Sequence, residues 1–347
     1  MQTIKASVVG ASGYGGAEAV RLLTSHPQVD IVHVTAETQQ GQAMSKLYPN
    51  LRQFVDQTMI GADTERIARD SDVVFVSLPS GKAMHLAPAM LAQNCKVIDI
   101  AADFRLHDAA LYPTWYKFDH IAPDYLGEAV YGLPELHREA IATTRLLANP
   151  GCYPAASLLA LIPLLKAGKV KTSGIIIDAK SGVSGAGRGG GGGFGYAEVN
   201  ENLSAYGVAG HNHTAEIEQE LSAIAGSAVR VVFTPHLVPM TRGILATVYA
   251  PLNGALSNQE AFNLYAETYS DAPFVRVLDD ALPQTKATLG SNYCDVAVKI
   301  DPRTDMAIAI AAIDNLGRGA AGQAIQNMNL MFDLPETTGL QFPGVFP

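Results

Sequence analysis

Cysteine, tryptophan and long apolar runs are scarce in this chain. Its 347 residues include three Cys and one Trp, and no run of 18 or more apolar residues. A helix that spans a bilayer needs about 20 such residues, so we expect no membrane insertion. The N-terminal stretch also lacks the basic region and apolar core of a secretion signal. The cysteines are far apart and form no C-x-x-C pair or zinc spacing, and their odd, sparse count favours a reducing, cytoplasmic setting.

Basic residues are also few. Lys and Arg total 24 against 33 Asp and Glu, which gives a net charge of −9. Such a surface repels a phosphate backbone, so nucleic-acid binding is not expected. The length predicts two domains more readily than one. Because the net charge is negative, binding of an anionic small molecule would need a local cluster of Arg or Lys. The candidates are Arg105, Lys180, Arg188 and Arg242.

The first third of the chain alternates short apolar runs with helical patterns, which predicts a parallel sheet covered by helices. Strands are expected at 4–9, 31–35, 73–78 and 96–100, and helices at 15–25 and 82–92. The stretch 103–145 is rich in Pro, Tyr and His, and we expect it to be irregular. This part of the chain therefore predicts a Rossmann-type dinucleotide-binding domain.

The rest of the chain has longer strands that partly alternate, as expected of a half-exposed sheet. A short strand at 146–148 and the turn Asn149-Pro150-Gly151 precede a helix from about Pro154, which Pro163 should kink or end. Five consecutive glycines at 189–193 predict a mobile loop. The expected strands are 175–179, 228–234, 244–250, 294–300 and 306–313, with a last helix at about 320–332.

The first strand ends in a glycine-rich turn that opens a helix. Gly10, Gly13 and Gly16 give the spacing G-x-x-G-x-x-G, with Ser12 where the usual fingerprint has its second glycine. Such turns let backbone N–H groups approach a pyrophosphate, although a tight turn without a ligand is the alternative. Glu37 follows the second strand and, taken alone, favours NAD by accepting a ribose hydroxyl. A solvent-exposed loop position is the other interpretation of Glu37.

Cys152 differs from the other two cysteines in its local sequence. It follows a Pro-Gly turn and precedes a helix, and the free N–H groups of a helix start stabilise a thiolate. Cys95 and Cys294 begin apolar strands, which is typical of buried structural cysteines. A structural role is the alternative for Cys152 as well.

A proton-transfer partner for this thiolate is predicted in the segment His211-Asn212-His213-Thr214-Ala215-Glu216. A histidine on a glycine-flanked loop is a candidate acid or base. Thr214 is expected to cap the following helix, and Glu216 in its first turn suits the helix dipole. Metal binding by the two histidines is disfavoured, because no third ligand is apparent.

Taken together, these segments resemble the N-acetyl-gamma-glutamyl-phosphate reductase family of the semialdehyde dehydrogenases. The resemblance runs through nearly the whole chain, and P-G-C-Y and S-G-V-S-G-A-G-R are its most specific parts. The matching stretches are Gly10–Glu18, Asp103–Leu106, Asn149–Pro154, Ser181–Arg188, His211–Glu216, Gly290–Asp295, Asp314–Leu316 and Gly319–Gln323.

The resemblance implies a reaction and a set of site residues. An acyl phosphate is attacked by Cys152, phosphate leaves, and hydride from NADP(H) reduces the thioester to an aldehyde. NADP is the family's cofactor, and NAD stays open because of Glu37. The implied catalytic residues are Cys152, His211 and Glu216, and the implied substrate-binding residues are Arg105, Ser184, Arg188 and His213. The implied cofactor-binding residues are Gly10, Ser12, Gly13, Tyr14, Gly15, Gly16, Ser77, Pro79, Ser181, Gly182 and Asn315.

The resemblance also implies an organisation. The expected fold class is α/β, with a Rossmann-type domain and an α+β catalytic domain that holds a mixed or antiparallel sheet. The dinucleotide-binding domain would be discontinuous, formed by 1–150 and 315–347, and 151–314 would form the catalytic and oligomerisation domain. The expected partners are a small-molecule acyl phosphate and further copies of the chain, as a homodimer or homotetramer. No resident metal is expected.

Three positions depart from the family's pattern, and three other functions stay open. Ala155 stands where the family has Thr, Asn212 stands where it has Arg, and the glycine run replaces mixed residues after Arg188. The first alternative is a related reductase of aspartyl phosphate or of a carrier-linked aminoadipyl phosphate. The others are a cysteine hydrolase that uses Cys152 and His211, and a dinucleotide-sensing regulator without chemistry.

Overall fold

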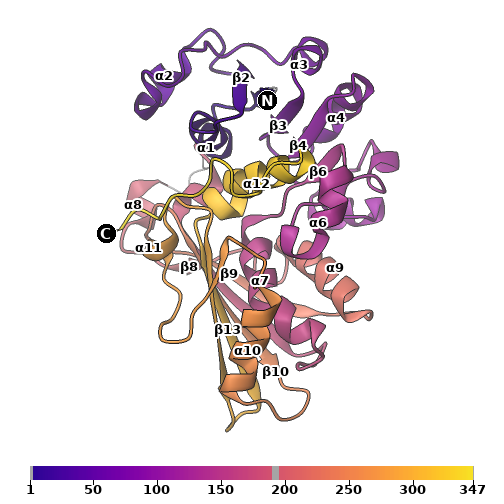
Figure 1. Cartoon of the computed structure of the whole chain (residues 1–347), viewed down its shortest axis with the longest axis vertical. Coiled ribbons are helices and arrows are strands. Elements are labelled where there is room, and N and C mark those ends of the chain that lie inside the picture. Colours follow the sequence, from indigo (N-terminus) through magenta and orange to yellow (C-terminus); the bar gives the residue numbers. More distant parts are fainter. Residues whose placement is uncertain (1–2, 190–194, 347) are drawn as a thin grey trace. The chain divides into compact units, whose positions relative to one another are not determined.

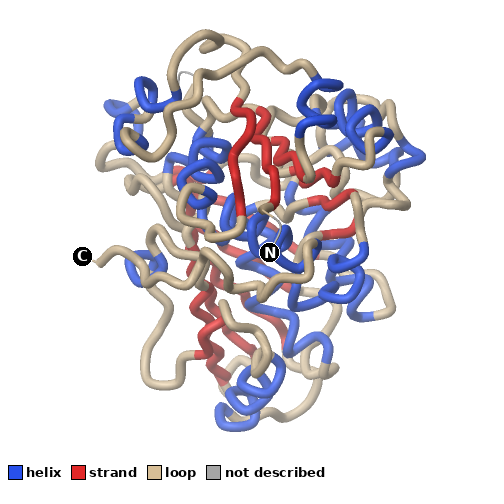
Figure 2. The backbone as a smooth tube through the Cα atoms, turned by 45° about the horizontal axis from the view of Figure 1, so that its top comes forward, coloured by secondary structure: helices blue, strands red, loops and turns tan. Residues whose placement is uncertain are grey.

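A computed structural model of the chain describes residues 3–189 and 195–346. Its strands form a six-stranded and a seven-stranded sheet (red in Figure 2). Each sheet belongs to one of two compact units, which we describe separately. The first holds the described residues up to Pro150, with Gly187–Gly189 and Ala320–Gln341. The second holds Gly151–Ala186, the described residues from Gly195 to Gly319, and those from Phe342. The predicted α/β fold class is confirmed.

The first sheet is entirely parallel, with strand order β2-β1-β3-β4-β6-β5. The predicted strands of this region are confirmed to within a few residues. Helices α1 and α4 also lie where helices were predicted. The strands are β1 (Ile4–Val9), β2 (Val29–Val34), β3 (Val73–Val76), β4 (Lys96–Asp99), β5 (Val130–Tyr131) and β6 (Leu146–Ala148). The helices are α1 (Tyr14–Leu23), α2 (Met44–Leu47), α3 (Thr64–Asp70), α4 (Ala83–Ala92), α5 (Tyr112–Trp115), α6 (Pro134–Thr143) and α12 (Gly322–Met331).

Helix α12 is buried although its sequence is rich in amides. It packs against α1 and α6 of the same unit and is the yellow helix in Figure 1. Buried amides need partners, and the backbone supplies them: Gln323 Nε2 and Asn327 Nδ2 both donate to the carbonyl of Gly132, at 3.0 and 2.8 Å. Asn329 Nδ2 donates to the carbonyls of Glu336 and Thr338. These bonds fix the C-terminal helix in the first unit.

The second sheet is mixed, with strand order β11-β12-β13-β10-β7-β9-β8. The pairs β7–β9 and β11–β12 are parallel and the others are antiparallel. Side chains alternate along β7, β9, β10 and β13, and one face packs on α7, α9 and α10. The strands are β7 (Ile175–Ser181), β8 (Ser204–Ala205), β9 (Val231–Leu237), β10 (Ile244–Pro251), β11 (Val275–Val277), β12 (Cys294–Asp301) and β13 (Met306–Ile313). The helices are α7 (Cys152–Lys166), α8 (Tyr196–Val199), α9 (His213–Ala225), α10 (Asn258–Thr268) and α11 (Thr285–Thr288).

Helix α7 begins earlier than predicted and continues past Pro163, the residue that was predicted to kink or end it. It begins at Cys152 rather than Pro154, with Gly151 as the N-cap, and it does not end at Pro163 but runs on to Lys166. A proline inside a helix leaves the carbonyl four residues earlier without its N–H donor. Here the hydroxyl of Tyr269 donates to that carbonyl, of Leu159, at 2.6 Å. A tertiary contact thus replaces the missing helical bond.

Two further expectations were wrong. The stretch 103–145 is not irregular throughout, because α6 begins at Pro134, where the fixed backbone angle of proline suits the first helical turn. The cap of α9 is Asn212 rather than Thr214, and its side chain accepts a bond from the backbone N–H of His213. The loop predicted at 189–193 lies, apart from Gly189, outside the described residues.

Candidate functional site

The glycine turn between β1 and α1 is closed so tightly that two of its positions exclude a side chain. Gly10 has a φ of +87°, and a Cβ there would lie 2.2 Å from the carbonyl oxygen of Ser77. A Cβ on Gly16 would lie 2.3 Å from the carbonyl oxygen of Gly10. Gly13 is different, since its Cβ would meet only Gly10 O at 3.6 Å.

The start of α1 suits an anion. Gly13 is the N-cap, it supplies no side-chain cap, and the first turn of this helix carries no acidic residue. The N–H groups and the dipole of a helix start favour negative charge. Tyr14, Gly15 and Gly16 form this first turn, so the predicted cofactor residues of the turn lie where a pyrophosphate would fit.

One hydroxyl and one guanidinium from elsewhere in the first unit bind the same turn. Tyr48 donates its hydroxyl to the carbonyl of Ser12, and Arg188 Nε donates to the same carbonyl, both at 2.8 Å. Ser77 follows β3, and its hydroxyl lies 2.9 Å from where a Cβ of Gly15 would stand. Arg188, which the resemblance assigns to the substrate, therefore lies at the glycine turn.

Other predicted residues of the first unit have different surroundings. Pro79 and Glu37 are exposed, Pro79 after β3 and Glu37 after β2. Arg105 is 6% exposed, and its guanidinium donates to the carbonyls of Asn149 and Ile100 at 2.7 and 3.0 Å. It thereby holds the end of β6, directly before the Pro-Gly turn.

Carboxylates surround the segment that carries Arg105. Asp99 is fully buried, and burial followed by the charge of Asp103 raises its pKa above the usual range, while Arg105 opposes this shift. Asp103 accepts from the backbone N–H groups of Gly81 and Met84, at 2.6 and 3.0 Å. The segment 99–105 thus ties the loop after β3 to the end of β6.

The second unit contains a pocket of about 240 Å³ in which Cys152 and His211 both take part. Cys152 is half-buried at the N-terminus of α7, whereas Cys95 and Cys294 are buried, as predicted from their strands. Burial raises the pKa of the Cys95 thiol to about 12, so that cysteine is unreactive at neutral pH. The pocket is lined by Cys152, Tyr153, Ser181, Gly182, Gly185, Ala186, Tyr206, His211, Asn212, His213 and Leu237.

Glu216 holds the backbone that leads into Cys152. It lies on α9, is 0% exposed, and its Oε1 accepts a bond of 2.7 Å from the N–H of Gly151. That N–H precedes the first helical turn of α7. The carboxylate therefore fixes the position of the helix start on which the thiol is placed.

His211 is enclosed by rings. Tyr153, Tyr206 and Phe233 lie edge-on to its imidazole, with centroids 5.8, 5.5 and 5.4 Å away. This burial lowers the pKa of His211 to about 4. Its Nδ1 accepts the backbone N–H of His213 at 3.2 Å, so in the neutral ring the proton is on Nε2. The imidazole is thus uncharged at neutral pH and presents an N–H donor.

Tyr206 is a residue of this pocket that sequence reasoning missed. Its hydroxyl donates to that of Tyr153 at 3.0 Å, and Tyr153 in turn donates to the carbonyl of His236 at 3.3 Å. Burial raises the pKa of Tyr206 to about 12 and also raises the pKa of Tyr153, so both phenols stay protonated. The only sequence indication was its place beside Gly207, just before the histidine segment.

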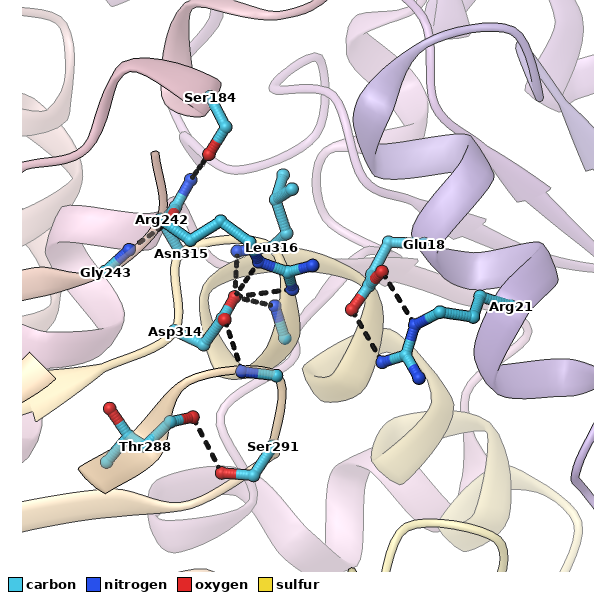
Figure 3. A network of polar contacts seen from close by, with 12 residues as sticks. Glu18, Arg21, Ser184, Arg242, Gly243, Thr288, Ser291, Asp314, Asn315 and Leu316 are labelled. Carbon is cyan, nitrogen blue, oxygen red and sulfur yellow. Dashed lines mark hydrogen bonds and ion pairs between the residues drawn. The ribbon is translucent and has the colours of Figure 1, made fainter. Parts of the chain in front are cut away.

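The loop Ser181–Arg188, which we call the serine-glycine loop, is held by Asn315, a residue that follows β13. Asn315 Oδ1 accepts from the N–H of Gly243 at 2.8 Å, and its Nδ2 donates to Ser184 Oγ at 2.9 Å (Figure 3). Both groups of the Asn315 amide are therefore used inside the second unit. Ser181 and Gly182 of this loop line the pocket, whereas Ser184, which is 6% exposed, does not.

The structure thus gathers some predicted residues and separates others. Cys152, Ser181, Gly182, His211 and His213 line one pocket. Ser184, Glu216 and Asn315 support its walls. The glycine turn, Ser77, Pro79, Arg105 and Arg188 belong to the first unit. In residues 3–189 and 195–346, no group of three or more His, Cys, Asp or Glu is arranged to hold a metal ion. No helix of these residues is long and apolar enough to cross a bilayer.

Comparison with known proteins gives matches over both units. Residues 5–144 match the NAD binding domain of semialdehyde dehydrogenases, and residues 152–315 match their dimerisation domain. The chain is 56% identical to an N-acetyl-gamma-glutamyl-phosphate reductase of Symbiobacterium thermophilum, over 99% of this chain and 100% of that protein. It is 51% identical to the protein of that name from Desulforudis audaxviator, with the same coverage.

Solved structures share the fold at low identity. Aspartate semialdehyde dehydrogenase II of Vibrio cholerae aligns with a TM-score of 0.74 at 18% identity, over 96% of this chain and 99% of that one. Aspartate semialdehyde dehydrogenase of Candida albicans, solved with NADP, aligns with a TM-score of 0.69 at 18% identity, over 95% and 99%. These likenesses show the architecture alone.

Proposed function

The chain belongs to the N-acetyl-gamma-glutamyl-phosphate reductases of the semialdehyde dehydrogenase family, and on this premise we propose its reaction. It reduces N-acetyl-L-glutamyl 5-phosphate to N-acetyl-L-glutamate 5-semialdehyde and phosphate, a step of arginine biosynthesis. The observation that carries this proposal is the half-buried Cys152 at the start of α7, in a pocket shared with His211. We place the enzyme in the cytoplasm.

In the first step the sulfur of Cys152 attacks the acyl carbon of the substrate. A thioester bond forms, the carbon–oxygen bond to phosphate breaks, and phosphate leaves with the electron pair of that bond. The start of α7 supports the thiolate, because its N–H groups and dipole favour negative charge. Glu216 holds this helix start in place through Gly151.

His211 contributes to both steps through its neutral ring. The acyl oxygen gains negative charge when sulfur adds to the carbon, and gains it again when hydride does. An N–H donor aimed at that oxygen lowers the barrier, as at an oxyanion hole. The Nε2–H of His211 is the donor that the ring provides. Its role in proton transfer stays a prediction, since a low pKa leaves little imidazolium at neutral pH.

The reduced nicotinamide, when bound, supplies the hydride for the thioester carbon. The residues of the first unit fit such a cofactor, because Gly13 leaves the start of α1 without a side-chain cap. We propose NADP rather than NAD, following the family, although Glu37 lies exposed beyond β2. Arg188 contacts Ser12 of the glycine turn, so we propose that its charge serves the phosphates of the cofactor.

The other site roles stay proposals. We keep Arg105, Ser184 and His213 as the side chains proposed for the anionic substrate, of which only His213 lines the pocket. The domain division at about residues 150 and 315 is likewise retained as a proposal.

We further propose that two copies of the chain associate through the second sheet. The face of β7, β9, β10 and β13 away from the helices carries apolar side chains, with Ile176 42% and Val232 59% exposed. Exposed apolar patches of this kind mark interaction sites. Ile176→Arg should therefore yield monomers in sedimentation analysis, and an unchanged oligomer would place the interface elsewhere.

Substrate identity is tested by comparing three acyl phosphates. The kcat/KM should be highest with N-acetyl-glutamyl phosphate and lower by orders of magnitude with aspartyl phosphate and with a carrier-linked aminoadipyl phosphate. Equal or better turnover of either competitor would overturn the assignment. Hydrolysis of the acyl phosphate at the same rate without dinucleotide would indicate a cysteine hydrolase instead.

A further inference from the structure

Asp314 is a buried carboxylate that joins separate segments of the second unit (Figure 3). It follows β13 and is 0% exposed. Its Oδ2 accepts the N–H of Gly290 at 2.6 Å. Its Oδ1 accepts the N–H groups of Leu316 and Gly317, both at 2.8 Å. Arg242 also donates to Oδ1, from Nη2 at 2.8 Å and from Nε at 3.2 Å.

These bonds fold the chain after β13 into a tight turn. The backbone carbonyl of Asp314 accepts the N–H of Gly319 at 2.9 Å, which closes the turn 314–319. The turn passes so close to a neighbouring loop that a Cβ on Gly317 would lie 2.2 Å from the carbonyl oxygen of Ser291. The backbone at Gly317 therefore has no room for a side chain.

Gly319, the last residue of this turn, packs closely against the proposed nucleophile, Cys152. A Cβ on Gly319 would lie 2.7 Å from the Cβ of Cys152 and 3.3 Å from its Cα. The turn 314–319 contributes no residue to the lining of the pocket. Gly319 therefore lies against Cys152 without itself lining the pocket.

We propose that Asp314 is a positioning residue for Cys152 and that it acts through Gly319. The carboxylate fixes the turn, and Gly319, which has no side chain, packs against Cys152 and sets the position of its Cβ. We call this contact the backstop. Together with Glu216, which holds Gly151, two buried carboxylates then fix the start of α7. The proposal rests on the proposed role of Cys152 as nucleophile.

The most direct variant is Gly319→Ala, which adds one methyl group toward Cys152. We expect kcat to fall by about 100-fold or more, because a misplacement of about 1 Å at a reacting atom costs about that much. KM and the dissociation constant of NADPH should stay near wild type. Gly127→Ala is the matched control, since a Cβ there meets nothing within 4 Å.

A second pair of variants tests the carboxylate itself. Asp314→Asn keeps the size of the side chain and removes its charge, and we expect kcat to fall about 10-fold or more with little change in KM. Asp295→Asn is the control. Asp295 lies on β12, the strand adjacent to β13, and it is also a buried carboxylate that pairs with an arginine, Arg276 of β11. It should lose stability without loss of kcat.

Circular dichroism and thermal melting establish that each variant is folded before its kinetics are compared. Should Asp314→Asn not fold, Arg242→Lys tests the same contact. Lysine keeps a positive charge beside Asp314 but lacks the paired Nε and Nη2 donors of the guanidinium. A folded Gly319→Ala enzyme with wild-type kcat would overturn the proposal. So would equal losses of kcat in Asp314→Asn and Asp295→Asn.

The outcome is separable from that of the proposed function. If Cys152→Ser is inactive while Gly319→Ala is fully active, Cys152 remains the nucleophile and only the backstop is wrong. If Cys152→Ser keeps wild-type turnover, the proposed function fails, whatever the glycine variants do.

Discussion

The carboxylate of Glu216 accepts a hydrogen bond of 2.7 Å from the backbone N–H of Gly151, the residue before Cys152. The bond joins α9, which follows the histidine loop, to the start of α7. Glu216 is 0% exposed, so the contact is shielded from water. The residue is therefore well placed to fix the cysteine relative to His211.

Loss of this bond should cost stability as well as rate. Glu216→Ala leaves the N–H of Gly151 without its carboxylate, and an unsatisfied buried donor costs about 1–3 kcal/mol of unfolding free energy. We expect urea denaturation to show that loss, and kcat to fall with it. Glu216→Gln keeps an oxygen acceptor and should lose less.

Arg230→Ala is the control beside the same helix. The side chain of Arg230 is 78% exposed and pairs with Glu218 of α9, so its loss should cost about 1 kcal/mol or less. If Glu216→Ala were no less stable and no slower than this control, the positional role of Glu216 would be wrong.

The imidazole of His211 should titrate far below an ordinary histidine. Burial among rings lowers its pKa to about 4 in the folded chain, whereas an unfolded histidine titrates near 6.5. The unfolded state therefore binds a proton first as pH falls, and the stability contributed by the neutral ring is lost between about pH 6.5 and 4. NMR titration of the ring proton, assigned with His211→Gln, measures the pKa directly. A midpoint near 6.5 would contradict the enclosed, neutral imidazole.

The glycine turn makes a prediction with opposite signs for stability and binding. Gly13→Asp places a carboxylate at the N-cap of α1, where it should stabilise the helix by about 0.3 kcal/mol relative to Gly. The same carboxylate would occupy and repel the place of the pyrophosphate, so NADPH binding should be lost in a fluorescence titration. Gly13→Ala is the control and has room for its methyl group. Retained NADPH affinity in Gly13→Asp would remove the pyrophosphate from this turn.

The choice between NADP and NAD is tested at Glu37. An acid beside the adenosine ribose accepts its hydroxyl and repels a 2′-phosphate. If Glu37 lies there, Glu37→Gln should raise kcat/KM with NADPH and lower it with NADH. Parallel changes, or no change, in both would show that Glu37 takes no part in selecting the cofactor.

Much of the fold could be predicted because its determinants are local. The strand at 306–313 was predicted at its observed bounds, since the alternation of Met306–Ile313 is a property of adjacent residues. The glycine turn and the cysteine at a helix start are local as well. The helix α10 was missed even though Ser257 and Glu260 form a capping box that the sequence displays.

What could not be predicted depends on contacts between distant segments. Pro163 does not end α7, and the carbonyl of Leu159 that the proline leaves without its helical donor accepts from Tyr269, which directly follows α10. The bonds of Asp314 reach Gly290 and Arg242, which no local pattern connects with it. Arg188 follows Ser184 of the second unit closely in sequence, yet it belongs to the first unit, where it contacts Ser12. Tyr206 has no periodic context and enters the pocket only through the fold.

The central claim is that Cys152 carries the acyl group, and intact-protein mass spectrometry tests it most directly. Enzyme mixed with N-acetyl-glutamyl phosphate in the absence of dinucleotide should release one phosphate rapidly and gain the mass of the acyl group. The adduct should map to Cys152, be removed by hydroxylamine, and disappear on addition of NADPH as aldehyde forms. Cys152→Ser should show neither burst nor adduct. A wild-type enzyme that turns over without such an adduct, or a Cys152→Ser enzyme that still turns over, would contradict the account.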